Sequence, residues 1–502
     1  MMRGMTSSIL LVLLLVGCGP ASVKGLGDDT GTPGHDSADT SDSADTTDSA
    51  DTSDTAHTGE TASEAVSDLA VRLHPSIASV VYVSWTQVRE TVPVHVEYTY
   101  ADGETGVTPS MPGTVGAHEQ ILLGIPYATP VTWRVVVEED GGEAEGPGIT
   151  TGPVPSALPD ILLDTADDAR WEPTGRYLLT SVSTDDPSMS HEPGFWVTLV
   201  DRQGRYVWAI PADPGSWTLF AKPSRDGTTI LYDDDLFWTS FDGGVDSAVH
   251  QIKLDGSELR TWETPGLAHA YDDLSADTIA WARSGNRDDQ LVISAGDAEA
   301  RLVWSCLDWI YTSDIARSPD NPSQEQCGSN ALSYNEDRDT YTISLWSHET
   351  VLELDGTSGE VLWYADPHTN HGYDLAGGSP VWEWQHEVQN LSEDRLLLSS
   401  GVDPQRDGSF RATAAYEYEI DHTNGTLTLV WSYTSEPEFA ARFKGGVRRL
   451  SGGNTLQYYG SAGGVKEITP ESDVVWQVRF DGRETTWTGR SYWLDDLYAF
   501  AP

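Results

Sequence analysis

A repeated unit in the C-terminal two-thirds of the sequence limits the folds open to this chain. In each copy a predicted strand ends in an acidic or glycine-containing turn, and a strand that carries a tryptophan follows. These tryptophans are Trp208, Trp262, Trp304, Trp363, Trp431 and Trp476. Repeats of roughly 40–50 residues, each with several short strands, are typical of a β-propeller. Since no long apolar pattern of helical period follows residue 66, we expect an all-β chain.

Most copies are followed by a second repeated unit, a Leu-Ser turn that leads into another strand. Examples are Asp273–Asp277, Asn390–Leu396 and Arg449–Leu456. Six copies predict a six-bladed β-propeller over residues 165–502. The strand Arg176–Ser181 and the C-terminal stretch 490–500 should share one blade, because such closure leaves no free sheet edge.

Residues 67–153 predict a β-sandwich ahead of the repeats. Val80–Trp85 and Val94–Tyr100 alternate in polarity and are rich in β-branched and aromatic residues, as strands are. The stretch Leu123–Val135 resembles the end of a fibronectin type III domain, where a Leu, a Pro, a Thr and an aromatic residue precede an Arg-Val strand. This resemblance implies a fibronectin type III or Ig-like sandwich with Trp85 in its core. We expect the sandwich to serve in spacing or docking.

The N-terminus indicates export. Arg3 precedes the apolar run Ile9–Val16, which is shorter than the about 20 apolar residues that a membrane-spanning helix needs. We therefore predict a signal peptide over residues 1–17. The order Leu-Val-Gly-Cys that ends at Cys18 resembles the bacterial lipobox, which implies a lipidated Cys18 and an exported lipoprotein of the outer membrane, periplasm or cell surface. An ordinary secretory signal with a chance cysteine is the alternative.

Residues 18–66 predict an extended, acidic tether. From Asp36 to Asp54 an aspartate recurs every third residue among Ser, Thr and Ala, so like charges repel and no core can form. A calcium site is the alternative, although the segment lacks the turn glycines of a formed calcium loop. The whole chain has a formal charge of −50, which excludes nucleic-acid binding through a basic face and electrostatic docking on anionic lipid.

The two remaining cysteines are Cys306 and Cys327. In an exported protein a disulfide between them is favoured, because the compartment is oxidising. Such a bond closes the loop Leu307–Gln326. Two free buried thiols are the alternative.

Two histidines occupy the same position relative to the Leu-Ser turn. His269 lies five residues before Leu274, and His386 lies five residues before Leu391. Equivalent positions in two blades should bring both imidazoles to the same end of the central channel. The alternative is that each histidine is simply packed or exposed on the surface.

The chain from about residue 170 to residue 500 resembles the bacterial arylsulfotransferases. The resemblance rests on the tryptophan repeats, Gln385-His386-Glu387, the His269 element before a turn, Gly446–Leu456, and Gly464–Thr469 followed by Val475-Trp476. It implies a periplasmic six-bladed propeller with an N-terminal sandwich and one disulfide. Such enzymes move a sulfuryl group from one phenol to another through a transiently sulfated histidine, without a nucleotide donor.

The resemblance also implies roles for the two histidines. His386 matches the family's nucleophile, and a neutral imidazole nitrogen can attack sulfur to give a labile N–S bond. His269 matches a second histidine, which can hold the sulfuryl oxygens or protonate the leaving phenolate.

Two further positions depart from the family's pattern. A histidine of a His-x-Asn element is replaced by Gly328, and an arginine of a Ser-x-Arg element is replaced by Trp346. Loss of one such donor typically costs about 3–4 kcal/mol of transition-state stabilisation. His348 or Arg411 could compensate.

The sequence thus predicts an arylsulfotransferase-like enzyme with a small aromatic sulfate donor, a phenolic acceptor and a membrane lipid anchor. The alternative is a non-catalytic cell-envelope propeller that binds a ligand or a protein. We expect no cofactor, no metal and no nucleic acid. His368, His371 and Asp374 have a spacing that zinc ligands also show, but their Gly- and Pro-flanked sequence favours a polar loop.

Overall fold

The computed structural model describes residues 65–502 with the exception of residues 91, 139–141, 184–193, 236–246, 286–287, 297, 313–326, 369–370, 404–408, 442 and 482–485. The predicted signal peptide, Cys18 and the tether up to residue 64 lie outside the described residues. The chain divides into the units Met1–Thr58 and Gly59–Pro502, and all elements below belong to the second. None of the helices in the described part is long and apolar enough to cross a membrane.

The predicted all-β fold class is confirmed. Within the described residues, the elements other than strands are one short helix, α2 (Cys306–Thr312), and single 3-10 turns. These turns are η2 (Ala101–Gly103), η3 (Trp346–His348), η4 (Pro437–Phe439), η5 (Gly460–Ala462) and η6 (Leu497–Phe500).

The N-terminal part consists of two small antiparallel sheets. One contains, in order, β1 (Val66–Leu73), β2 (Val81–Gln87) and β5 (Gly116–Leu122). The other contains β4 (Glu104–Val107), β3 (Val94–Tyr100), β6 (Pro130–Val137) and β7 (Gly142–Glu145), and β8 (Ile149–Thr150) pairs with β6. Alternate residues of β2 and β3 are buried, and both sheets contribute to a single core that contains Trp85 and Trp133. The alternation read from the sequence therefore places these strands correctly.

Six further sheets follow, which we name A to F. Sheet A contains β12 (Tyr206–Pro211), β11 (Phe195–Asp201), β10 (Tyr177–Ser183) and β35 (Thr488–Leu494). Sheet B contains β13 (Ala221–Pro223), β14 (Ile230–Asp234), β15 (Ala248–Ile252) and β16 (Glu258–Glu263). Sheet C contains β17 (Leu267–Ser275), β18 (Thr278–Gly285), β19 (Asp288–Ala295) and β20 (Arg301–Ser305).

The remaining three sheets have five strands each. Sheet D contains β21 (Ser329–Asn335), β22 (Thr340–Leu345), β23 (Thr350–Asp355), β24 (Val361–Asp366) and β25 (His371–Gly372). Sheet E contains β26 (Asp374–Leu375), β30 (Thr426–Thr434), β29 (Ala412–Asp421), β28 (Arg395–Val402) and β27 (Glu383–Ser392). Sheet F contains β31 (Gly445–Arg449), β32 (Thr455–Tyr459), β33 (Gly464–Ile468), β34 (Val474–Asp481) and β9 (Asp160–Ala166).

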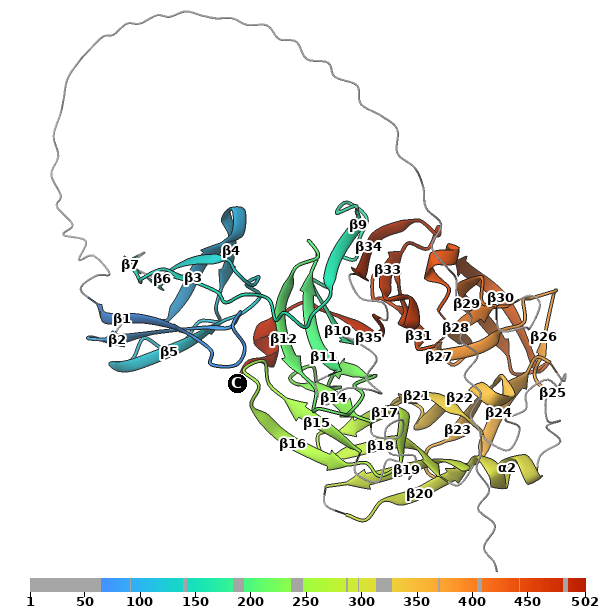
Figure 1. Ribbon diagram of the computed structural model, residues 1–502. Coiled ribbons are helices and arrows are strands. Elements are labelled where there is room, and N and C mark those ends of the chain that lie inside the picture. The colour runs from blue at the N-terminus through green and yellow to red at the C-terminus, as the bar shows by residue number, and fades with distance from the viewer. Residues whose placement is uncertain are drawn as a thin grey trace, which may run out of the picture. The chain divides into compact units, whose positions relative to one another are not determined.

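The six sheets follow one another in chain order around a common centre (Figure 1). One edge strand of each sheet lies on the inside: β35, β13, β17, β21, β27 and β31. Neighbouring sheets touch through these strands, and β31 of sheet F contacts β35 of sheet A. Residues on the six inner strands can therefore meet, although they are far apart in the sequence.

The repeated tryptophans all lie in the fourth strand from the inside of their sheets. Three of them donate an indole hydrogen bond to a turn of the following sheet. Trp208 of sheet A donates to the Leu254 carbonyl at 2.7 Å, and Trp431 of sheet E donates to Pro470 at 2.9 Å. Trp476 of sheet F donates to the Arg202 carbonyl of sheet A at 2.9 Å. The repeat thus encodes contacts between successive sheets, including the contact that joins the last sheet to the first.

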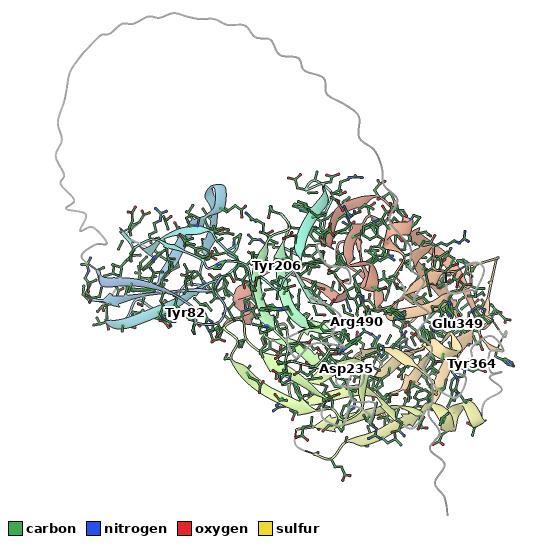
Figure 2. All side chains as sticks on the ribbon, in the orientation of Figure 1. Tyr82, Tyr206, Asp235, Glu349, Tyr364 and Arg490 are labelled. Atoms are coloured by element: carbon green, nitrogen blue, oxygen red, sulfur yellow. A yellow bond between two sulfur atoms is a disulfide. The ribbon has the colours of Figure 1, made fainter. Side chains whose placement is uncertain are left out.

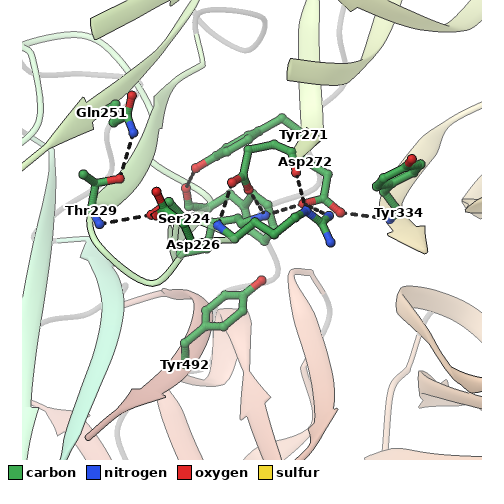
Figure 3. Close-up of polar contacts among 12 residues, drawn as sticks. Ser224, Asp226, Thr229, Gln251, Tyr271, Asp272, Tyr334 and Tyr492 are labelled. Atoms are coloured by element: carbon green, nitrogen blue, oxygen red, sulfur yellow. Dashed lines mark hydrogen bonds and ion pairs between the residues drawn. The ribbon is translucent and has the colours of Figure 1, made fainter. Parts of the chain in front are cut away.

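Polar groups tie the inner strands together as well (Figure 3). Lys222 of β13 forms ion pairs with Asp272 and Asp273 of β17. The Tyr334 amide of β21 donates to Asp272 Oδ2 at 2.8 Å, and the Tyr271 hydroxyl donates to the Phe220 carbonyl at 2.7 Å. Ion pairs therefore join sheets B and C at the centre, and a hydrogen bond joins sheet C to sheet D. The buried charges need such partners because isolated buried charges are costly.

The two ends of the sheet series are joined by pairing of distant segments. β10 pairs with β35, as the sequence analysis predicts for these two stretches. The outer edge of sheet F is covered by β9, which pairs with β34 and which the sequence analysis did not anticipate. Both pairings satisfy strand edges that would otherwise be exposed.

Cys306 and Cys327 form a disulfide with an S–S distance of 2.03 Å, which confirms the prediction. Cys306 begins α2 directly after β20, and Cys327 precedes β21. Both cysteines are fully buried in a core that sheets C and D share. The bond therefore links the end of one sheet to the start of the next.

Removal of this disulfide should lower the free energy of unfolding. For a sequence separation of 21 residues, the loss of loop-closure entropy in the unfolded chain corresponds to about 3 kcal/mol. We expect Cys306→Ala/Cys327→Ala to show this loss in urea unfolding, and the reduced wild-type protein should behave in the same way. A midpoint equal to that of the oxidised wild type would contradict the prediction.

Candidate functional site

His269 and His386 occupy matching irregularities on two inner strands. The β17–β18 register shifts between Leu267 and Tyr271, and the β27–β28 register shifts between Glu383 and Glu387. His269 has a positive φ of 68°, and Trp384, two residues before His386, has a φ of 53°. Such bulges re-aim side chains away from the regular pleat. Each histidine therefore lies where the regular pairing of its inner strand is interrupted.

Both histidines line one cavity of about 180 Å³. The cavity lies where sheets C, D and E meet, with residue 443 closing it from the segment before β31. Its described lining is Ala268, His269, Ser284, Asp289, Gly328, Ser329, Asn330, Trp346, Ser347, His386 and Phe443. The structure therefore brings together the two predicted histidines and the two positions that depart from the resembled family.

Gly328 and Trp346 are directly connected. The Trp346 amide donates to the Gly328 carbonyl at 2.8 Å. Gly328 has a φ of +61°, and a Cβ placed on it would lie 2.5 Å from the Ser347 hydroxyl oxygen. Since side-chain residues adopt such a φ only with strain, this backbone does not accept a histidine at position 328 without rearrangement.

Replacing Gly328 with alanine should destabilise the protein. The left-handed backbone costs about 1 kcal/mol for alanine, and the contact with Ser347 adds to this cost. We expect Gly328→Ala to lower the free energy of unfolding by about 1–3 kcal/mol in denaturant titration. Gly377→Ala is the matched control, because Gly377 has a φ of 67° but open space around it. Equal losses in the two variants would show that the Ser347 contact contributes nothing.

Trp346 places an aromatic surface where the resembled family has a cation. It belongs to η3 and is partly exposed to the cavity. Its ring lies 4.8 Å from that of Trp384, and the Trp384 ring lies 6.1 Å from that of Phe410. The wall beside His386 is therefore suited to contact with an aryl ring.

His386 is held as a neutral imidazole with one defined tautomer. Its Nδ1 lies 2.9 Å from the Trp384 carbonyl oxygen. A carbonyl can only accept, so Nδ1 carries the hydrogen and Nε2 keeps its lone pair. Burial lowers the pKa of His386 to about 4, and the charges of Arg490 and Lys444 act in the same direction. A neutral Nε2 is the form that can act as a nucleophile.

His269 is also neutral near pH 7. Burial lowers its pKa to about 3, and His386, Lys444 and Arg490 contribute further lowering. Its backbone amide donates to Asp235 Oδ2 at 3.3 Å, which ties the bulge of β17 to sheet B. A neutral imidazole can still donate one hydrogen bond to a bound oxygen.

Two cations near the histidines were missed by sequence reasoning. Arg490, labelled in Figure 2, comes from β35 and is only 7% exposed. It donates to the Asn330 carbonyl at 3.0 Å, lies 3.7 Å from Glu387 Oε2, and packs on the Phe220 ring at 4.0 Å. The sequence does contain a signal for Arg490, because it is an arginine in the C-terminal stretch that we predict to share a blade with Arg176–Ser181. Arg490 lies outside the Leu-Ser units, the only positions at which the repeat pattern indicates site residues.

The second cation, Lys444, lies among aromatic rings. Its Nζ is 4.3 Å, 4.4 Å and 5.1 Å from the ring centroids of Trp217, Trp487 and Phe195. Burial lowers the pKa of Lys444 well below its usual value, against the opposing effect of Asp235. Within the described residues its Nζ has no hydrogen-bond partner. No sequence pattern pointed to this residue.

The two compensating residues suggested by the sequence do not line the cavity. Arg411 is exposed, and the buried His348 is absent from the described cavity lining. In the candidate metal loop, His368 instead lies 2.8 Å from Glu349 Oε2. The part of the chain that the structure describes contains no group of three or more His, Cys, Asp or Glu that could hold a metal.

Residues 305–481 match the family model described as Arylsulfotransferase (ASST). This segment is therefore similar to the arylsulfotransferase family. It contains His386, Gly328 and Trp346 but neither His269 nor Arg490. The arylsulfotransferase match thus covers sheets D and E, most of sheet F, and the disulfide, while part of the cavity wall lies outside it.

Comparison with other proteins gives only distant similarity. No curated protein matches the sequence. A protein of unknown function from Bacteroides caccae is 14% identical, with 61% of this chain and 93% of that chain covered and a TM-score of 0.37. A putative 6-phosphogluconolactonase from Bacteroides fragilis is 11% identical, with 79% and 98% covered and a TM-score of 0.36.

Proposed function

We propose that the chain is an arylsulfotransferase-like enzyme that transfers a sulfuryl group from an aryl sulfate to a phenolic acceptor through a sulfated His386. The observation that carries the proposal is the neutral Nε2 of His386 in a cavity that it shares with His269. The similarity of residues 305–481 to the arylsulfotransferases suggests the type of reaction, which is sulfuryl transfer. In this proposal sheets A to F, within residues 165–502, are the blades of a six-bladed propeller.

The chemistry follows from the protonation states. Nε2 of His386 attacks the sulfur of a bound aryl sulfate, the bond from sulfur to the aryl oxygen breaks, and that oxygen leaves as a phenolate, which then takes up a proton. The acceptor phenol then gives up a proton, its oxygen bonds to sulfur, the N–S bond breaks, and His386 returns to its neutral form. The Trp384 carbonyl, 2.9 Å from Nδ1, stabilises the positive charge that the ring acquires while it carries the sulfuryl group.

Other cavity residues fit the same reaction. His269 serves as the electrophilic or acid–base partner, because a neutral imidazole can donate to a sulfuryl oxygen. Trp346 stacks on the aryl group of the donor or acceptor. Arg490 adds positive potential beside both histidines, which favours the approach of an anionic sulfate to an otherwise acidic protein.

The N-terminal residues complete the proposal. A signal peptide over residues 1–17, a lipid on Cys18 and an acidic tether over residues 18–66 would hold the enzyme at the cell envelope. Residues 67–153, as a fibronectin type III-like sandwich, would then space or dock it. This arrangement accords with the disulfide, which is typical of exported proteins.

The test is a transfer assay on the purified protein. With 4-nitrophenyl sulfate as donor and phenol as acceptor, we expect 4-nitrophenol release, phenyl sulfate formation, and a sulfated His386 found by mass spectrometry when the acceptor is left out. Absence of all three products in a folded wild-type protein would refute the enzyme. The non-catalytic envelope propeller, in which the same cavity only binds a ligand, would then take its place.

A further inference from the structure

Three titratable side chains occur in the described lining of the cavity: His269, His386 and Asp289. The proposed function uses the two histidines and leaves Asp289 without a role. Asp289 lies at the start of β19 and is 4% exposed. A carboxyl group buried in the wall of a reaction cavity is a candidate for proton transfer.

The surroundings of Asp289 raise the pKa of its carboxyl group above the usual value. Burial raises the pKa of Asp289, and Asp288 acts in the same direction, while hydrogen bonds from Ser329 and Ser284 oppose the rise. The Ser329 amide donates to Oδ2. His269 and His386, which line the same cavity, are both neutral near pH 7 and therefore do not oppose this rise.

The reaction needs a proton donor, and a carboxyl group is a far stronger acid than the N–H of a neutral imidazole. A phenolate is a poor leaving group unless it is protonated as the S–O bond breaks. His269, with a pKa of about 3, carries no extra proton at neutral pH. Position 328, where the resembled family has a histidine, is a glycine whose φ of +61° would strain any side chain.

We propose that Asp289 is the general acid and base of this site. This inference rests on the proposed function. In the first step Nε2 of His386 bonds to sulfur, the bond from sulfur to the aryl oxygen breaks, and that oxygen takes the proton of Asp289. In the second step the acceptor phenol gives its proton to the Asp289 carboxylate as its oxygen bonds to sulfur and the N–S bond breaks. Both steps balance without a further reactant, and His269 keeps the electrophilic role.

The neighbouring Asp288 provides a matched control. It lies on the same strand but is absent from the described cavity lining, and its carboxylate accepts from the Ser305 hydroxyl at 3.0 Å and from the Leu307 amide at 3.0 Å. Asp288→Asn and Asp289→Asn make the same chemical change, carboxyl to amide, one residue apart. Only the second removes a proton from the cavity.

The experiment compares two donors of different leaving-group basicity. 4-Nitrophenol leaves as a stable anion and needs little protonation, whereas phenol needs much. We expect Asp289→Asn to lower kcat for phenyl sulfate about 100-fold or more and for 4-nitrophenyl sulfate less than about fivefold. Asp288→Asn should change both rates equally. A purely structural role of Asp289 would lower both rates by the same factor, and that result would overturn the proposal.

The wild-type protein gives a second readout if Asp289→Asn does not fold. A solvent deuterium isotope effect should appear on phenol release from phenyl sulfate and be much smaller for 4-nitrophenyl sulfate. Equal isotope effects on the two donors would overturn the role of Asp289, although a sulfated His386 would still support the enzyme. Failure of wild-type protein to turn over either donor would instead refute the proposed function itself.

Discussion

Replacing His386 with asparagine should abolish sulfuryl transfer. Asparagine has no nitrogen lone pair that can attack sulfur, and loss of a covalent nucleophile typically lowers kcat by at least about 10⁴-fold. The side-chain amide is of similar reach and can still donate to the Trp384 carbonyl, so the bulge of β27 should persist. The measurement is 4-nitrophenol release, together with mass spectrometry of the peptide that contains position 386.

The control for this variant is His422→Asn. His422 is exposed and contacts the Tyr373 hydroxyl at 3.1 Å, away from the cavity, so its replacement should leave the transfer rate unchanged. If His386→Asn retained transfer within tenfold of wild type, another nucleophile would have to carry the sulfuryl group. A sulfated His269 in that variant would identify it.

His386→Asn should also change how the stability of the protein depends on pH. The folded pKa of His386, about 4, lies below the value of about 6.5 for an unfolded chain. Between these values the unfolded state binds more protons, so stability falls as the pH is lowered from 6.5 to 4. His386→Asn removes this contribution, and its denaturation midpoint should fall less over that window than the wild-type midpoint does.

The sequence predicts the parts of this fold that local patterns encode. The tryptophan repeat and the Leu-Ser turns locate successive strands, because each copy contains the hydrogen-bonding and packing groups of one sheet. The equal spacing of His269 and His386 from the turn predicts that they share a cavity, since equivalent inner-strand bulges face the same centre. The pairing of β10 with β35 also follows, because a series of sheets leaves two edges to close.

Other parts depend on contacts that no local pattern records. β9 pairs with β34 at the outer edge of sheet F, although more than 300 residues of sequence separate the two strands. No pattern in Asp160–Ala166 indicates which strand it pairs with. Arg490 reaches the site from the last strand, where its neighbours come from sheets B, D and E. Asp289 follows another aspartate and resembles an acidic turn. The neighbours of Arg490 and Asp289 are set only in the folded chain, where the inner strands of different sheets come together.

Replacing Arg490 with methionine should cost about 3–5 kcal/mol of unfolding free energy. Arg490 is buried between Glu387 Oε2, at 3.7 Å, and the Asn330 carbonyl, at 3.0 Å. Glu387 is itself only 3% exposed and would keep Arg448, at 3.1 Å, as its remaining cation. Burial already raises the pKa of Glu387, and Arg490 opposes that rise. Loss of Arg490 therefore leaves the buried carboxyl group of Glu387 more costly to ionise.

A double-mutant cycle separates this charge effect from lost packing. Glu387→Gln removes the carboxylate, so Glu387→Gln/Arg490→Met should be less destabilised than the sum of the single variants. Arg395→Met, which breaks an ion pair with Glu419 on the surface, should cost less than about 1 kcal/mol. Strict additivity in the cycle would show that Arg490 stabilises the site through Phe220 and Asn330 alone. A coupling of 1 kcal/mol or more, on the order expected for contacting charges, would instead show that the ion pair holds the inner strands of sheets A and E together next to His386.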